Sequence, residues 1–185
     1  MGLTFRYIDD AILPLYLIKG EECQACDRPR DLYRFYEDLP TPDGSPSPVD
    51  AVCAECLQSG SFQFGLRGTL IGRVTQFVNR HFTRGTLSGE ARRQRIETIL
   101  GDYLRTPHLP NIAWDDWPDC CGDFTEFVGD AGSTYRGSFD GFEFRGPEDD
   151  VCIRYGIEGN MRGEDRVSLF RCLACGKKCW TLRYT

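Results

Sequence analysis

Histidine is scarce in this sequence: only His81 and His108 occur among 185 residues. A histidine general base needs a positioned partner, and neither residue lies in a recognisable nucleophile motif. The sequence also lacks a phosphate-binding loop and a dinucleotide fingerprint. The glycine-flanked stretch at 159–163 has the wrong spacing for either. These absences favour a protein that is not an enzyme.

A surplus of basic side chains is also missing. The chain carries 22 lysines and arginines against 28 acidic residues, which gives a formal net charge of -6. Broad phosphate binding draws on clustered basic residues, so nucleic acid is the less favoured partner and a basic protein the more favoured one. The triplet Arg92, Arg93 and Arg95 is interpreted as a solvated helix face, with a nucleic-acid contact as the alternative.

Long apolar runs are absent too. The longest, residues 11–18, contains Pro14, follows two aspartates and ends at Lys19. It is shorter than the roughly 20 residues of a membrane span and has no basic start like that of a secretory signal. The sequence thus predicts a cytoplasmic protein with no membrane partner. In that compartment thiols stay reduced, and paired cysteines more often hold metal than form disulfides.

Cysteine, by contrast, is abundant, with ten in the chain. Cys23, Cys26, Cys53 and Cys56 form the pattern C-x2-C-x26-C-x2-C. Two residues between thiolates let a tight turn present both sulfurs to one tetrahedral ion, and the second pair completes the shell. The pattern predicts a closed, structural zinc site in a zinc-ribbon-like unit. Iron, four unligated thiols and thioredoxin-like redox chemistry are the alternatives, the last lacking a βαβ setting.

A second zinc site is predicted around Cys172 and Cys175, between strand-like segments at 167–171 and 180–184. Its other ligands are sought among Cys120, Cys121, Cys179 and His108, and Cys120 and Cys121 are favoured. Because these two are adjacent, both face one ion only if the backbone follows an unusual path. The alternative is a set of packed free thiols.

The predicted fold class is α+β. Strand-like runs occur at 4–7, 32–36, 124–128 and 151–155, and the C-terminal β unit is expected to be mostly antiparallel. Apolar residues at helical spacing from Ile96 to Leu104, with Ser88 as a cap and Pro107 as a stop, predict a helix. A second helix is predicted over 70–81. The chain therefore divides into a zinc-ribbon-like unit (1–60), a helical segment (61–107) and a β-rich unit (108–185), or forms one domain overall.

Four stretches, taken together and in this order, resemble the CbrC-like family of bacterial proteins. They are Phe5-Arg6-Tyr7 with cysteine pairs 23/26 and 53/56; 104–107 followed by Trp114 and Trp117; 120–129; and 169–177. Residues 61–95 match poorly. The family is associated with tolerance of nuclease colicins, and no enzymatic activity is firmly attached to it. The resemblance therefore implies a cytosolic immunity protein that binds and occludes a nuclease-type toxin.

An acidic segment behind two tryptophans is the predicted partner-binding surface. It comprises Trp114, Asp115, Asp116, Trp117 and Asp119. Its carboxylates would steer onto a basic toxin, and its indoles would anchor the interface. The alternatives are a solvated loop, tryptophans buried in the core, and a hydrolase that uses Asp119 and Asp123.

Overall fold

The computed structural model describes residues 5–35, 41–45, 47, 49–66, 68–82, 88–109, 117–131, 135, 140–145 and 167–182. The chain forms two compact units, Met1–Pro110 and Asn111–Thr185, which are treated separately below. Both contain antiparallel strands, and the helices described lie in the first, so the fold class is α+β as predicted. Among the described residues, no helix is long and apolar enough to cross a membrane.

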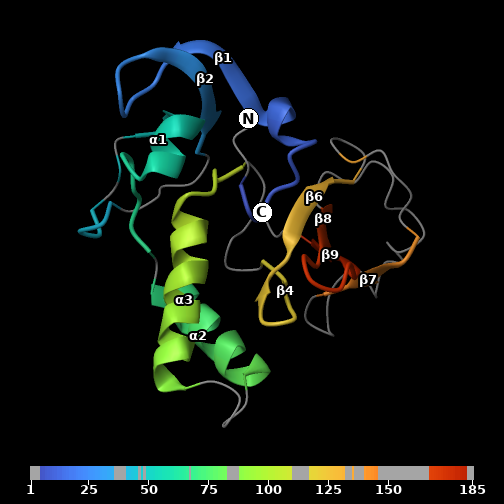
Figure 1. The fold of residues 1–185 in the computed structure, drawn as a ribbon. Coiled ribbons are helices and arrows are strands. Elements are labelled where there is room, and N and C mark those ends of the chain that lie inside the picture. Colours follow the sequence, from blue (N-terminus) through green and yellow to red (C-terminus); the bar gives the residue numbers. More distant parts are fainter. Residues whose placement is uncertain are drawn as a thin grey trace. The chain divides into compact units, whose positions relative to one another are not determined.

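The N-terminal unit begins with a small antiparallel sheet. After a 3-10 helix η1 (Leu13–Tyr16) come β1 (Leu17–Glu22), β2 (Pro29–Arg34) and β3 (Ala51–Cys53), which pair in the order β1-β2-β3. Figure 1 shows β1 beside β2. Leu32 pairs with Cys53 across β2 and β3, so this register sets where the second cysteine pair starts. The short helix α1 (Ala54–Ser59) follows directly and ends at Gly60, whose φ of 72° suits a glycine.

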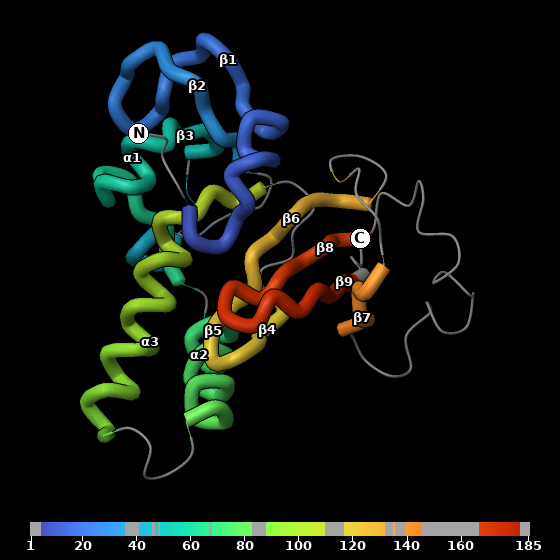
Figure 2. Tube along the Cα trace, turned by 45° about the vertical axis from the view of Figure 1, so that its right-hand side comes forward, coloured from blue at the N-terminus to red at the C-terminus, as the bar shows by residue number. Residues whose placement is uncertain are grey.

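Two longer helices complete this unit, α2 (Gly68–His81) and α3 (Gly89–Leu104), side by side in Figures 1 and 2. Ser88 caps α3, its hydroxyl accepting a hydrogen bond from the Ala91 N–H at 3.1 Å. α2 buries Leu70, Val74, Phe77 and Val78, the helical spacing seen in the sequence. Both predicted helices are confirmed.

The C-terminal unit is built from a hairpin and a four-stranded sheet. The hairpin consists of β4 (Asp119–Cys120) and β5 (Asp123–Phe124). The sheet has the order β6-β8-β9-β7, and Figure 2 shows β8 beside β6 and β9. Its strands are β6 (Glu126–Asp130), β7 (Phe142–Phe144), β8 (Val167–Arg171) and β9 (Lys178–Leu182), all pairs being antiparallel except β7 with β9.

Several local predictions differ from the structure. Residues 5–7 form a turn instead of a strand, and α1 lies where no helix was predicted. Arg34 ends β2, two residues before the predicted end of that strand, and the predicted strand at 151–155 lies outside the described residues. The prediction of three segments, 1–60, 61–107 and 108–185, stays a prediction.

Candidate metal centres

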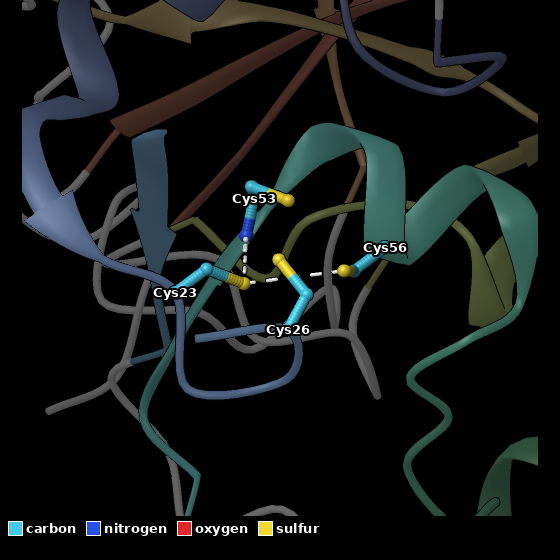
Figure 3. Close-up of side chains that lie close together, drawn as sticks. All are labelled: Cys23, Cys26, Cys53 and Cys56. Atoms are coloured by element: carbon cyan, nitrogen blue, oxygen red, sulfur yellow. Dashed lines mark hydrogen bonds between the residues drawn. The ribbon is translucent and has the colours of Figure 1, made fainter. Parts of the chain in front are cut away.

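The first cluster brings together Cys23, Cys26, Cys53 and Cys56, whose sulfurs all lie within 4.8 Å of one another. Figure 3 shows Cys23 and Cys26 on the turn between β1 and β2, with their sulfurs facing those of the other two residues. Cys53 ends β3 and is the N-cap of α1, and Cys56 lies in that helix. The start of α1 thus presents one C-x2-C pair, and the β1–β2 turn presents the other.

Backbone hydrogen bonds hold the first turn in shape. The Cys23 N–H donates to the Arg28 carbonyl at 2.9 Å, and the Asp27 N–H donates back to the Cys23 carbonyl at 2.8 Å. Asp27 has a φ of 54°, the left-handed region that aspartate tolerates better than most residues. The Cys53 N–H also donates to the Cys23 sulfur at 3.3 Å, which joins the two pairs directly.

Gln24 attaches this turn to β3. Its side-chain oxygen accepts hydrogen bonds from the N–H groups of Asp50 at 2.7 Å and Ala51 at 3.1 Å. The backbone N–H of Gln24 donates to the Ala51 carbonyl at 3.4 Å. Because Ala51 is two residues before Cys53, these bonds fix the distance between the two cysteine pairs. This role of Gln24 is not visible in the sequence, because no spacing rule marks a glutamine inside a C-x2-C turn.

The second cluster consists of Cys120, Cys121, Cys172 and Cys175, again with all sulfurs within 4.8 Å. The first two lie at the β4–β5 hairpin and the last two on the turn between β8 and β9. Cys120 is 3.7 Å from the Cys175 sulfur and 3.8 Å from that of Cys121. Two hairpin turns therefore supply the four sulfurs.

Adjacent cysteines share this cluster because the hairpin loop has an uncommon backbone. Cys121 and Gly122 are the two loop residues between β4 and β5, and their φ angles are 53° and 76°. Positive φ at both central positions is the requirement of a type I′ turn, which suits the twist of a two-residue hairpin. This turn is the unusual backbone path that two adjacent cysteines need if both are to face one ion.

The two C-x2-C turns that follow β1 and β8 have the same backbone pattern. In the second, the Cys172 N–H donates to the Lys177 carbonyl at 2.7 Å and the Gly176 N–H donates to the Cys172 carbonyl at 3.0 Å. Gly176, with a φ of 71°, takes the place that Asp27 has in the first. Each turn also connects two antiparallel strands. The chain thus builds one cysteine turn twice.

The spacing of the sulfurs fits a tetrahedral metal ion. Zinc–sulfur bonds of about 2.3 Å in a tetrahedron put the sulfurs about 3.8 Å apart. Three of the sulfur–sulfur separations are 3.7, 3.8 and, between Cys23 and Cys56, 4.0 Å, and none within either cluster exceeds 4.8 Å. A disulfide would need about 2.05 Å. Both clusters therefore have the donor set and the dimensions of a tetrathiolate metal site.

A protein-family model matches residues 3–182, nearly the whole chain. The chain belongs to the uncharacterised protein family UPF0167. This is the CbrC-like family that the sequence resembles. No curated protein and no solved structure gives a significant match to the chain.

In this UPF0167 chain the two clusters differ in exposure. Cys23, Cys53 and Cys56 of the first are buried, whereas Cys121 and Cys175 of the second are exposed. Zinc bound in the first cluster would be shielded by protein, and zinc in the second would lie beside solvent. Exposed thiolates exchange metal and react with electrophiles more readily than buried ones, so a metal ion in the second cluster would be the more labile of the two.

Thiol pKa values reflect the crowding of four sulfurs. Burial opposes ionisation of Cys23, but hydrogen bonds led by the Cys53 N–H lower its pKa to about 7. The Lys177 backbone N–H and the Cys172 side chain lower the pKa of Cys175 to about 7. Burial and neighbouring thiols raise the pKa of Cys56 and of Cys120. A divalent cation is what lets four adjacent thiols ionise together.

The other ligand candidates lie outside the clusters. Cys179 is buried on β9, and burial raises the pKa of its thiol to about 11. His108 is 2% exposed among aromatic rings of the N-terminal unit, with ring centroids 4.3 Å from Phe64 and 5.2 Å from Tyr103. Both belong to the hydrophobic core of their own unit.

The proposed tryptophan anchor at 117 is wrong. Trp117 is fully buried, its indole N–H donates to the Thr125 carbonyl at 2.7 Å, and its ring packs against Phe127 and Phe170. It is a core residue, so an interface cannot reach it. Asp119 is half-buried on β4, and Trp114, Asp115 and Asp116 lie outside the described residues.

The residues of the two alternative functions have structural surroundings of their own. Asp123 is 7% exposed and accepts a hydrogen bond from the Phe124 N–H at 2.9 Å, so it holds the hairpin backbone. Arg93 forms an ion pair with Glu90 at 2.7 Å on α3, while Arg92 and Arg95 are half-buried. The structural role of Asp123 weakens the hydrolase hypothesis. The surroundings of the three arginines weaken the nucleic-acid hypothesis.

Proposed function

We propose that this protein binds two zinc ions at structural tetrathiolate centres and acts by binding a basic partner protein. The observation that carries the proposal is the pair of cysteine clusters with tetrahedral spacing. Four protein sulfurs leave no open coordination position, so neither centre offers a site for substrate or water. Zinc is proposed because thiolates in a tetrahedron suit it and because it needs no redox partner.

Charge supports the choice of partner. Four thiolates contribute four negative charges and zinc contributes two positive ones, so each centre makes the formal net charge more negative by two. From -6 for the chain, two centres give about -10. Acidic proteins associate faster with basic partners. The family resemblance supports the choice of a nuclease-type toxin domain as this partner, and in this proposal the protein is a cytoplasmic immunity factor.

Co-expression tests the proposal. Nuclease-type toxin domains, including any encoded in a gene adjacent to this one, are expressed in a bacterial host with and without the zinc protein, and survival is counted. Tagged protein is used in parallel to recover the toxin from the same cells. Protection together with recovery is the expected result. Absence of both would sink the immunity proposal, and a salt-sensitive DNA shift by the purified protein would support the nucleic-acid alternative instead.

A further inference from the structure

The turn between β8 and β9 presents a sulfur of the second metal centre to solvent. Every residue of the segment 173–178 is exposed, and Cys175 lies within it. Even the apolar side chain of Leu173 is 43% exposed there. Cys26, which has the corresponding place in the turn of the first centre, is half-buried. A small reagent in solution therefore reaches the second centre more easily than the first.

Binding to zinc would keep Cys175 in its reactive form. A thiol that coordinates a divalent cation is deprotonated, and the thiolate is the form that attacks electrophiles and oxidants. Cysteines that respond to oxidants are exposed thiolates with a second cysteine close by. Cys175 meets the first of these conditions through its exposure, and the neighbouring sulfurs of the cluster decide the second.

Cys120 supplies a second sulfur close to that of Cys175. The two sulfurs are 3.7 Å apart, and a disulfide bond is about 2.05 Å long, so they must approach by about 1.6 Å. Cys120 directly precedes the two-residue loop of the β4–β5 hairpin, and Cys175 lies on the β8–β9 turn. Such connecting segments adjust more easily than the interior of a sheet. A disulfide between these two residues therefore needs only a local movement.

Two competing pairs in the cluster are less suited to a disulfide. Adjacent Cα atoms are about 3.8 Å apart, which is below the usual range of about 4.4 to 6.8 Å for a disulfide, so a bond between Cys120 and Cys121 would be strained. Cys172 is 3% exposed, and its sulfur accepts a hydrogen bond from the Cys175 N–H at 3.4 Å. Burial keeps this sulfur away from reagents in solution.

We propose that Cys175 is a modification site, at which a peroxide oxidises the second centre to a disulfide between Cys120 and Cys175 and releases its zinc. The first centre keeps its metal under the same conditions. The inference rests on the proposed function for the zinc ion in the second cluster. It gives the two centres different roles, since the first is purely structural and the second responds to oxidants.

The reaction balances with the peroxide as the only oxidant. The Cys175 thiolate attacks one peroxide oxygen, the O–O bond breaks, and hydroxide leaves, which gives a sulfenic acid. The Cys120 thiolate then attacks the Cys175 sulfur, so that the S–S bond forms and a second hydroxide leaves. Two electrons have passed from the thiolates to the peroxide, and two protons from solvent convert the hydroxides to water. Zinc loses two of its four ligands and dissociates.

The disulfide would preserve the connection that the metal makes. It joins the β4–β5 hairpin to the β8–β9 turn, which are the two segments that hold the four sulfurs. The C-terminal unit therefore stays closed while its metal is absent. A thiol reductant can reopen an exposed disulfide by exchange, after which zinc binds again. The modification is thus reversible.

Peroxide treatment of the zinc-loaded, full-length protein tests the proposal. A colorimetric indicator follows zinc release, and peptide mapping under non-reducing conditions locates the disulfide. One of the two zinc ions should leave, Cys120 and Cys175 should be linked, and a thiol reductant with added zinc should restore the metal content. Release of both ions at the same rate, earlier oxidation of the first-centre cysteines, or a disulfide between other residues would overturn the proposal.

Matched ligand exchanges identify the reacting sulfur. Cys175→His keeps four ligands, because three cysteines and one histidine are a common zinc set, but it removes the oxidisable atom. Peroxide should release zinc from the second centre of this variant about tenfold more slowly than from the wild type. Cys26→His makes the same exchange in the first centre and should leave release from the second unchanged. Equal rates in Cys175→His and wild type would overturn the proposal.

The peptide map separates this inference from the proposed function. If Cys175→His holds only one zinc ion, the linkage found in the wild type decides the matter. If the wild type itself binds no zinc in the second cluster, the proposed function fails for that centre. A peroxide-treated chain without a bond between Cys120 and Cys175 would then overturn the modification site as well, and a chain with that bond would support it.

Discussion

Gln24→Ala should weaken the first metal centre without touching any of its ligands. The substitution removes the acceptor of the Asp50 and Ala51 N–H groups. Water can replace it at exposed Asp50, but Ala51 is 3% exposed and keeps an unsatisfied donor. The loss is about 1 to 2 kcal/mol. Since about 1.4 kcal/mol corresponds to a tenfold change in affinity, zinc at Cys23, Cys26, Cys53 and Cys56 should bind about 5- to 30-fold more weakly.

Competition with a chelator, combined with mapping of the free thiols, measures this loss of zinc affinity. Zinc-loaded protein is exposed to rising chelator, released cysteines are alkylated, and mass spectrometry identifies them. The first-site cysteines should become reactive at lower chelator concentration in Gln24→Ala, while those of the second site are unaffected. Gln94→Ala, on the exposed surface of α3, is the control, and Gln24→Glu retains the acceptor oxygens. Identical release in Gln24→Ala and Gln94→Ala would refute the role of this glutamine.

Three further predictions concern stability. Gly176→Ala should lower the free energy of unfolding by about 1 to 2 kcal/mol in chemical denaturation, because its φ of 71° strains any side chain even though the space around it is open. Gly72→Ala, inside α2, should raise the free energy of unfolding by about 1 kcal/mol. If both variants changed this free energy in the same direction, the strain argument would be contradicted. Trp117→Ala should lower the free energy of unfolding by about 3 to 5 kcal/mol, as expected for a buried indole. A near-neutral result would contradict the burial of Trp117. Burial, Asp10 and Asp31 raise the pKa of Tyr33 to about 12, so the unfolded chain ionises first and stability should fall as pH rises from about 10 to 12. The stability of Tyr33→Phe should fall less over this pH range than that of the wild type. If the two proteins had the same dependence of stability on pH, the role of Tyr33 would be contradicted.

The sequence predicted the elements with strong local signals. The Ser88 cap and the apolar spacing that follows it identified α3, and β8 occupies the predicted residues 167–171. The ligand pattern of the first cluster was visible because C-x2-C pairs carry a geometric requirement within a few residues. These features depend on neighbours in the sequence, and so they can be recognised without a fold.

Features that depend on tertiary contacts were not predictable. The aromatic Phe5–Tyr7 segment has strand propensity but forms a turn, because packing overrides a short propensity signal. Trp117 has acidic neighbours in sequence, yet its ring packs on Phe127 and Phe170. A cleft in the N-terminal unit is lined by residues of η1, β2 and α1, which are separate in the sequence, and no local motif marks it.

The zinc content of freshly purified protein tests the central claim most directly. Two tetrathiolate centres predict about two zinc ions per chain by elemental analysis, with one remaining in Cys53→Ser and one in Cys172→Ser. In the intact protein the eight cluster cysteines should resist alkylation until chelator is added. A folded, metal-free chain whose cluster cysteines all react at once would contradict the account.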